Sequence, residues 1–99
     1  TLHTPQNGVT FDATDFPLTS KVTAQDDSGI ELVDVLFTKE GKQGTQRLGR
    51  TSTLHPTVPN RYELIWDDSP GPGTYTIYAI AYDKTGNTTE SKKHTITIK

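Results

Sequence analysis

The hydrophobic and polar positions alternate most regularly between Thr74 and Tyr82. Side chains in a β-strand point alternately to opposite sides, so this stretch has two separate faces. One face carries Tyr75, Ile77, Ala79 and Ala81, and the other carries Thr76, Tyr78, Ile80 and Tyr82. Because both faces are largely apolar, the pattern predicts a central strand rather than an edge strand. The residues at positions 83–87 then predict a turn.

Five other stretches also alternate and are separated by residues that favour turns. They lie at residues 8–11, 18–25, 30–38, 61–66 and 94–98. The positions expected to face the core are Leu18, Ser20, Val22, Ala24, Val33, Val35, Phe37, Tyr62, Leu64, Trp66, Ile96 and Ile98. Segment 39–60 is interrupted by glycine and proline, so it predicts a loop-rich edge in which only 45–48 and 51–55 could form short strands.

The number and spacing of these strands predict an all-β fold. No segment of eleven residues shows a helical period, and turn residues recur about every eight to twelve positions, which is typical of a β-sandwich. With 99 residues, the chain has the length of one domain with one core. We therefore expect a single domain over residues 1–99, with residues 1–7 as a linker into the first strand.

Composition narrows the classes of function. The 10 Lys and Arg against 12 Asp and Glu give a net charge of −2 with both signs interspersed. We expect no nucleic-acid partner and no membrane partner, because the sequence has no basic patch and no apolar run of about 20 residues. The first residues also lack the pattern of a signal peptide. Cysteine is absent, which excludes disulfides and thiolate chemistry and favours a bacterial surface module.

Nearly the whole chain resembles the bacterial immunoglobulin-like domains found beside catalytic modules in secreted glycoside hydrolases, chitinases and other cell-surface proteins. The resemblance is most specific in the Gly-Thr-Tyr start at residues 73–75 and in the Ala-x-Ala-x-Asp-x-x-Gly-Asn end of the same strand. It implies an immunoglobulin-like antiparallel β-sandwich of about seven strands. It also implies structural roles for Trp66, at the end of the fifth strand, and for Tyr75, which suits the tyrosine corner of such sandwiches.

The chain departs from that family in two places. The connection at residues 39–60 is longer than usual, and the outer side of the sixth strand has Tyr78, Ile80 and Tyr82 where the family has Thr or Val. The third and sixth strands should be neighbours, so we expect one apolar surface patch formed by Leu32, Leu36, Tyr78, Ile80 and Tyr82. Three interpretations stay open: segment 39–60 or an adjacent domain covers the patch, the patch is a protein interface, or its aromatic rings stack on sugars.

The sequence contains no convincing catalytic constellation. His3, His55 and His94 fall on a terminus, a loop and the last strand, without a nucleophile elbow. The acidic pairs at 26–27 and 67–68 fall in turns, where carboxylates bond backbone amides. We therefore expect no enzymatic activity in this domain, although its parent protein could be an enzyme such as a glycoside hydrolase.

A calcium site is the one metal site that the sequence suggests. The turns after the second and sixth strands should lie at the same end of the sandwich, which would bring together Asp26, Asp27, Asp83 and Asn87 as oxygen ligands. The alternative is that each acidic or amide side chain caps its own turn. We expect no other cofactor.

The sequence thus predicts a non-catalytic accessory or spacer module of a larger secreted or cell-surface bacterial protein. Such a module would orient the neighbouring domains of its own chain and would itself be a monomer. The alternatives are a carbohydrate-binding module of a polysaccharide-degrading enzyme and an adhesin-like module that binds a surface protein.

Overall fold

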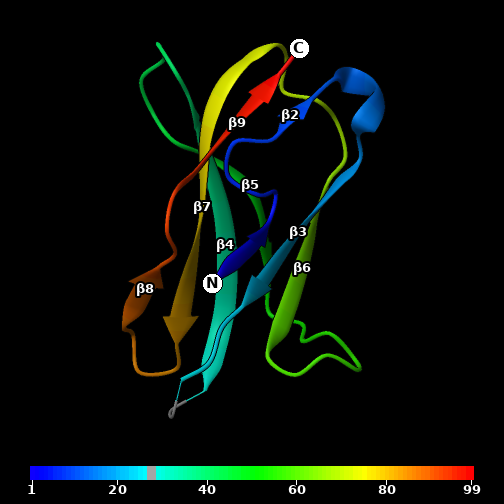
Figure 1. The fold of residues 1–99 in the computed structure, drawn as a ribbon. Helices are drawn as coiled ribbons and strands as arrows, with labels where there is room; N and C mark the ends of the chain where they lie inside the picture. Colours follow the sequence, from blue (N-terminus) through cyan, green and yellow to red (C-terminus); the bar gives the residue numbers. More distant parts are fainter. Residues whose placement is uncertain (27–28) are drawn as a thin grey trace.

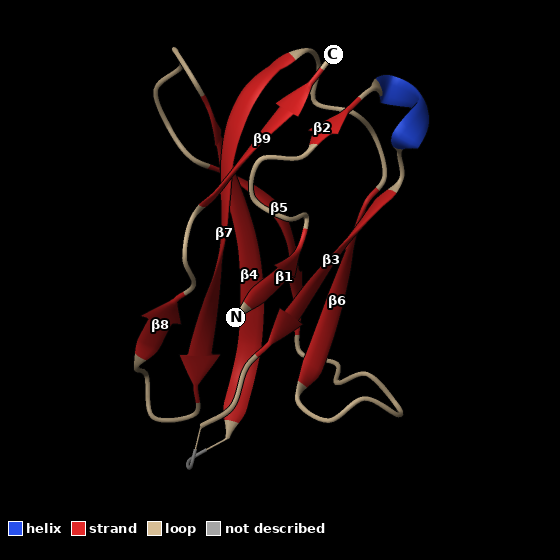
Figure 2. Cartoon of the chain, viewed as in Figure 1, coloured by secondary structure: helices blue, strands red, loops and turns tan. Residues whose placement is uncertain are grey.

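A computed structural model describes residues 1–26 and 29–99 as two β-sheets packed face to face (Figures 1 and 2). The smaller sheet has three strands in the order β1-β3-β6, and the larger has six, in the order β2-β9-β7-β4-β5 with β8 added beside β7. The strands are β1 Leu2–Thr4, β2 Thr10–Phe11, β3 Leu18–Thr23, β4 Ile30–Lys39, β5 Gln46–Thr51, β6 Arg61–Trp66, β7 Gly73–Asp83, β8 Thr88–Glu90 and β9 His94–Ile98. The predicted fold class, an all-β immunoglobulin-like sandwich, is confirmed.

The longest strands, β4 and β7, form the centre of the larger sheet. They pair antiparallel from Ile30 opposite Asp83 to Lys39 opposite Tyr75. The first strands divide between the sheets: β1 pairs antiparallel with β3, whereas β2 pairs parallel with β9. The predicted central strand and its neighbour are therefore confirmed.

The core lies between the sheets and consists of residues that the alternation predicts, with Leu2 added; three predicted members, Leu18, Ala24 and Ala81, are only partly buried and pack against it. Its most deeply buried members include Val33, Val35, Ile77 and Ile96, each with 0% of its surface exposed. Burying a side chain of this kind stabilises the fold by about 1.5–3 kcal/mol relative to leaving it in water. The core residues are Leu2, Val22, Val33, Val35, Phe37, Tyr62, Leu64, Trp66, Tyr75, Ile77, Ala79, Ile96 and Ile98.

Trp66 and Tyr75 belong to an aromatic cluster at one end of this core. The Trp66 ring lies 4.9 Å from that of Phe37 and 5.4 Å from that of Phe16, between ring centroids. The Tyr75 hydroxyl donates a hydrogen bond of 2.8 Å to the carbonyl oxygen of Gly71. A tyrosine at the start of this strand that bonds backbone a few residues upstream is the contact that defines a tyrosine corner.

Segment 39–60 differs from the prediction of two short strands at 45–48 and 51–55. It forms one edge strand, β5, which continues through Gly49 and ends at Thr51. At Gly49 an added Cβ would lie 3.0 Å from Cδ2 of Leu64. Glycine therefore does not interrupt this strand but lets its backbone pass close to the side chain of a core residue.

The expected linker at residues 1–7 is also wrong in part. It contains β1, and Leu2 keeps only 4% of its surface exposed. In the described part of the chain the strands number nine rather than about seven, because β1 and the wholly exposed β8 carry no alternating pattern. The C-terminus lies at one end of the sandwich and the N-terminus about midway along it (Figure 1).

Among residues 1–26 and 29–99, the helical content is one short 3-10 turn, Ala13–Asp15 (blue in Figure 2). Within the residues that the structure describes, no helix is long and apolar enough to cross a membrane.

Candidate interaction surface

The strand register brings the five residues of the predicted patch together on one face of the larger sheet. Leu32 of β4 is paired with Tyr82 of β7, and Leu36 is paired with Tyr78. Ile80 lies between the two tyrosines on β7 and is paired with Asp34. We refer to Leu32, Leu36, Tyr78, Ile80 and Tyr82 as the outer patch.

Charged side chains surround the outer patch and partly cover it. Its five residues are all half-buried, whereas the large hydrophobic side chains that stand exposed are Leu54, Val58 and Ile65, outside the patch. Asp34, in the middle of the patch, is only 2% exposed. Edge strand β5 explains this burial, because it pairs with β4 and places Arg50 opposite Asp34 and Arg47 opposite Leu36. Segment 39–60 therefore borders the patch on one side and places two arginines beside it.

Arg50 and Asp34 form the strongest polar contact of this surface. Nε and Nη2 of Arg50 donate hydrogen bonds of 2.6 and 2.9 Å to the two carboxylate oxygens of Asp34. These hydrogen bonds lower the pKa of Asp34 below its usual range and outweigh the opposing effect of burial. The carboxylate is thus ionised at neutral pH and its charge is matched by Arg50.

Two cations also lie over the tyrosines of the outer patch. The guanidinium carbon of Arg50 is 5.9 Å from the ring centroid of Tyr82, and Nζ of Lys93 is 5.3 Å from that of Tyr78. Such contacts are favourable because the ring face carries negative electrostatic potential. Both tyrosines are therefore oriented by a neighbouring cation.

The other half of this face, toward the start of β7, is made of threonine. Thr76 is paired with Thr38 on one side and with Thr95 on the other, and Thr74 is paired with Thr97. The Thr38 hydroxyl is 3.2 Å from that of Thr45. The outer face of the larger sheet thus changes from a hydroxyl-rich half to an aromatic and cationic half.

Sequence reasoning missed the charged members of this surface. Asp34 was expected to point away from the core, but its partner was not identified, and neither Arg47, Arg50 nor Lys93 was singled out. The sequence does contain one sign of this contact: Asp34 stands in the middle of an otherwise apolar strand, and a buried charge at such a position needs a partner.

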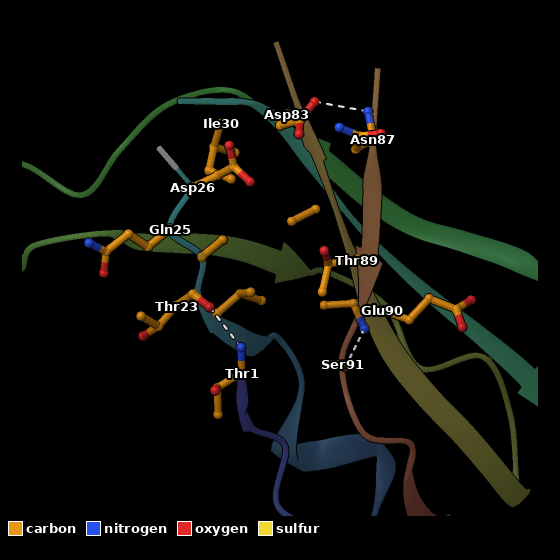
Figure 3. Close-up of a pocket in the computed structure, with 14 residues that line it drawn as sticks. Thr1, Thr23, Gln25, Asp26, Ile30, Asp83, Asn87, Thr89, Glu90 and Ser91 are labelled. Carbon is orange, nitrogen blue, oxygen red and sulfur yellow. Dashed lines mark hydrogen bonds between the residues drawn. The ribbon is translucent and has the colours of Figure 1, made fainter. Parts of the chain in front are cut away.

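A cleft of about 310 Å³ opens between β3 and the end of β7 with β8 (Figure 3). It has a floor of small apolar side chains, including Ala79 and Ala81, and a polar rim. Asp26, Asp83 and Asn87 line it together, so the two turns do lie at the same end. The fourth predicted calcium ligand, Asp27, lies outside the described residues.

Asp83 is engaged by its own turn. Its Oδ1 atom accepts hydrogen bonds of 2.8 Å from the backbone nitrogens of Thr85 and Asn87 and from the Thr85 hydroxyl. Burial alone would raise the pKa of Asp83, but these hydrogen bonds lower it overall. The alternative interpretation of this side chain, as the cap of its own turn, agrees with these contacts.

The carboxylates of the cleft do not converge on one point. Figure 3 shows the Glu90 side chain pointing away from Asp26 and Asp83. Among residues 1–26 and 29–99, no three His, Cys, Asp or Glu side chains are grouped so that they could hold a metal ion.

The three histidines lie apart, each beside its own partner. Nε2 of His3 is 2.7 Å from the Thr23 hydroxyl, and burial lowers the pKa of this histidine. Nδ1 of His55 accepts hydrogen bonds from the backbone nitrogens of residues 57 and 58. Nδ1 of His94 donates to the carbonyl oxygen of Pro5 at 2.8 Å. The structure brings none of them together with another.

Comparison with solved structures finds the same fold in proteins of very different sequence. Superoxide reductase (neelaredoxin) from Ignicoccus hospitalis is 17% identical, with a TM-score of 0.72 over 100% of this chain and 79% of that one. A structure of the fibronectin(III)-like modules of CbhA from Clostridium thermocellum is also 17% identical, with a TM-score of 0.69 over 99% of this chain and 92% of that one. At this identity the likeness concerns the fold alone.

The chain is therefore an immunoglobulin-like or fibronectin(III)-like β-sandwich. No protein-family model matches its sequence, and the search of curated proteins finds no match.

Proposed function

We propose that this domain is a non-catalytic accessory module of a larger secreted or cell-surface bacterial protein, in which it holds neighbouring domains at a set distance and orientation. The observation that carries the proposal is the likeness to the fibronectin(III)-like modules of CbhA, which covers almost the full length of both chains. The superoxide reductase shares the fold as well, so fold alone does not separate a module from an enzyme.

The arrangement of polar residues favours a module over an enzyme. The three histidines each contact a different part of the chain, and Asp34 and Asp83 are paired with groups that lower their pKa rather than raise it. A general acid near neutral pH needs a raised carboxyl pKa. These carboxylates have the opposite environment.

The continuous pairing of β4 with β7 also suits a spacer. The two strands pair along nearly their whole length and bury their inner side chains completely at several positions. A sheet of this kind resists large changes of shape, because the backbone hydrogen bonds hold each strand against its neighbours. The proposal therefore predicts a stiff connection.

The test is to place the domain between two reporter domains and to measure the interdomain distances by small-angle X-ray scattering. A spacer should give a narrow distribution, whereas a Gly/Ser linker of the same length should give a broad one. A distribution as broad as that of the linker would contradict the proposal. So would a hydrolytic activity of the isolated domain that is lost when one of its histidines is replaced.

A further inference from the structure

We propose that the outer face of the larger sheet binds a polysaccharide that carries carboxylate groups. The binding surface consists of the outer patch, Arg47 and Lys93, and the threonines that continue the same face. A module that only separates its neighbours needs no ligand, so this inference goes beyond the proposed function. If the inference fails, the proposed function is unaffected.

The net charge around the outer patch differs in sign from that of the whole chain. Among the charged side chains that pair with or contact the outer patch, three are Lys or Arg (Arg47, Arg50 and Lys93) and two are Asp or Glu (Asp34 and Glu90). These five give a formal charge of +1, whereas the whole chain has −2. An anionic ligand is therefore favoured here over the rest of the surface.

Two of these cations are available to form an ion pair with a ligand. Asp34 is matched by Arg50, while Nε of Arg47 lies 3.7 Å from the same carboxylate and its side chain is 51% exposed. No ion pair involves Lys93 in the described part of the chain. Arg47 and Lys93 are therefore the side chains that would pair with carboxylates.

Arg47 and Lys93 stand at the two ends of one row across the sheet. Arg47 is opposite Leu36, Leu36 is opposite Tyr78, and Lys93 lies over the Tyr78 ring. With strands about 4.8 Å apart, the backbone positions at the ends of this row are roughly 14 Å apart. A ligand lying along the row meets a cation, an apolar side chain, an aromatic ring and a second cation.

The neighbouring row supplies hydroxyl groups. Thr38, Thr76 and Thr95 are paired across three strands beside Leu36 and Tyr78. A threonine hydroxyl both donates and accepts hydrogen bonds, as a sugar hydroxyl does. The surface thus combines partners for carboxylates and for hydroxyls with aliphatic side chains, Leu32, Leu36 and Ile80, that can contact the apolar face of a sugar ring.

A polysaccharide fits this surface better than a protein does. The centre of a protein interface relies on large side chains that fill pockets in the partner. Here the large side chains are half-buried and flanked by cations, and the exposed ones lie outside the outer patch. An extended, hydroxyl-rich chain can use such a surface without needing a protruding apolar anchor.

The experiment is affinity electrophoresis in gels containing polygalacturonate, alginate or hyaluronate, with dextran and hydroxyethylcellulose as neutral polymers. At least one carboxylate polymer should retard the wild-type domain, and the neutral polymers should not. Arg47→Gln combined with Lys93→Gln should weaken binding about tenfold or more, because it removes both cations that would pair with carboxylates. Tyr78→Ala should also weaken it.

The matched control is Lys21→Gln combined with Lys42→Gln, which removes the same charge from the smaller sheet and from the β4–β5 turn. It should keep the wild-type retardation, and thermal melting checks that all variants are folded. The proposal is overturned if no carboxylate polymer retards the domain, if neutral polymers retard it equally, or if both double variants lose binding equally. One further outcome overturns it: polyglutamate retards the domain as strongly as the carboxylate polysaccharides do, and Tyr78→Ala weakens binding to neither polymer. The surface would then recognise acidic protein by charge alone.

Discussion

The inner and outer faces of β4 and β7 belong to the same two strands, yet they differ in almost every physical respect. On the inner face, Val33, Val35 and Ile77 are 0% exposed and belong to the hydrophobic core. On the outer face, one residue further along each strand, Leu36, Ile80 and Tyr78 are half-buried among arginine, lysine and threonine. Because the side chains of a strand alternate, the inner face of β4 and β7 can specify the fold while the outer face can evolve to bind a ligand.

This difference predicts that equal substitutions on the two faces have unequal costs. A substitution on the inner face leaves a cavity that water does not fill, whereas a substitution on the outer face removes contacts that water partly replaces. The following measurements test the comparison, beginning with the largest effect.

Replacing Ile77 with Ala should lower the free energy of unfolding by about 2–5 kcal/mol, because it leaves a cavity in the centre of the core. Replacing Ile80 with Ala, three residues along the same strand and on the other face, should cost about 1 kcal/mol or less. Urea denaturation measures both. Equal losses would mean that the outer face is as important for folding as the inner one.

Replacing Asp34 with Ala should cost about 1.5–3 kcal/mol, because it removes the acceptor of both Arg50 hydrogen bonds. Asp67→Ala, in the exposed turn after β6, removes the same charge and should have little effect. A double-mutant cycle with Arg50→Gln isolates the pair itself. A coupling energy near zero would show that the outer face contributes no specific polar contact to stability.

Replacing Tyr75 with Phe should cost about 1 kcal/mol, because it removes the hydrogen bond to Gly71 while keeping the buried ring. Tyr78→Phe, on the outer face of the same strand, should leave the melting temperature nearly unchanged. If the two variants melt alike, the tyrosine corner does not stabilise this domain.

The last prediction concerns stability in acid, and it has the smallest effect at neutral pH. The folded-state pKa values of Asp34 and Asp83 are lowered, so their contribution to stability is present above the unfolded value of about 3.9 and is lost as pH falls through the folded values. The contribution of these two carboxylates should thus be constant from pH 7 to about 5 and fall below about 4. The fall should be less steep in Asp34→Asn, and an unchanged slope would contradict the cited pKa direction.

Sequence alone was sufficient for the parts of the fold that depend on alternation. It placed Val33, Val35, Ile77 and Ile96 in the core, because a period of two decides which side chains share a face once a strand is assumed. The outward direction of the outer patch was predicted for the same reason, whereas the expectation that its two strands, β4 and β7, are neighbours came from the arrangement of strands in an immunoglobulin-like sandwich. Strand β8 was missed because backbone pairing alone holds it and its side chains are all exposed, and β1 was missed because three residues with one buried side chain, Leu2, are too few to show a period.

What the sequence by itself determined is therefore the fold class, the residues of the core and the identity of the outer face. Only the tertiary structure decided how that face is completed. The contact of Asp34 with Arg50 depends on where β5 pairs and on the bulge between its Gly49 and Arg47, and the position of Lys93 depends on the segment that joins β8 to β9. Alternation reports the direction of each side chain, whereas the identity of its neighbours is set by strand order and register, which no local pattern contains.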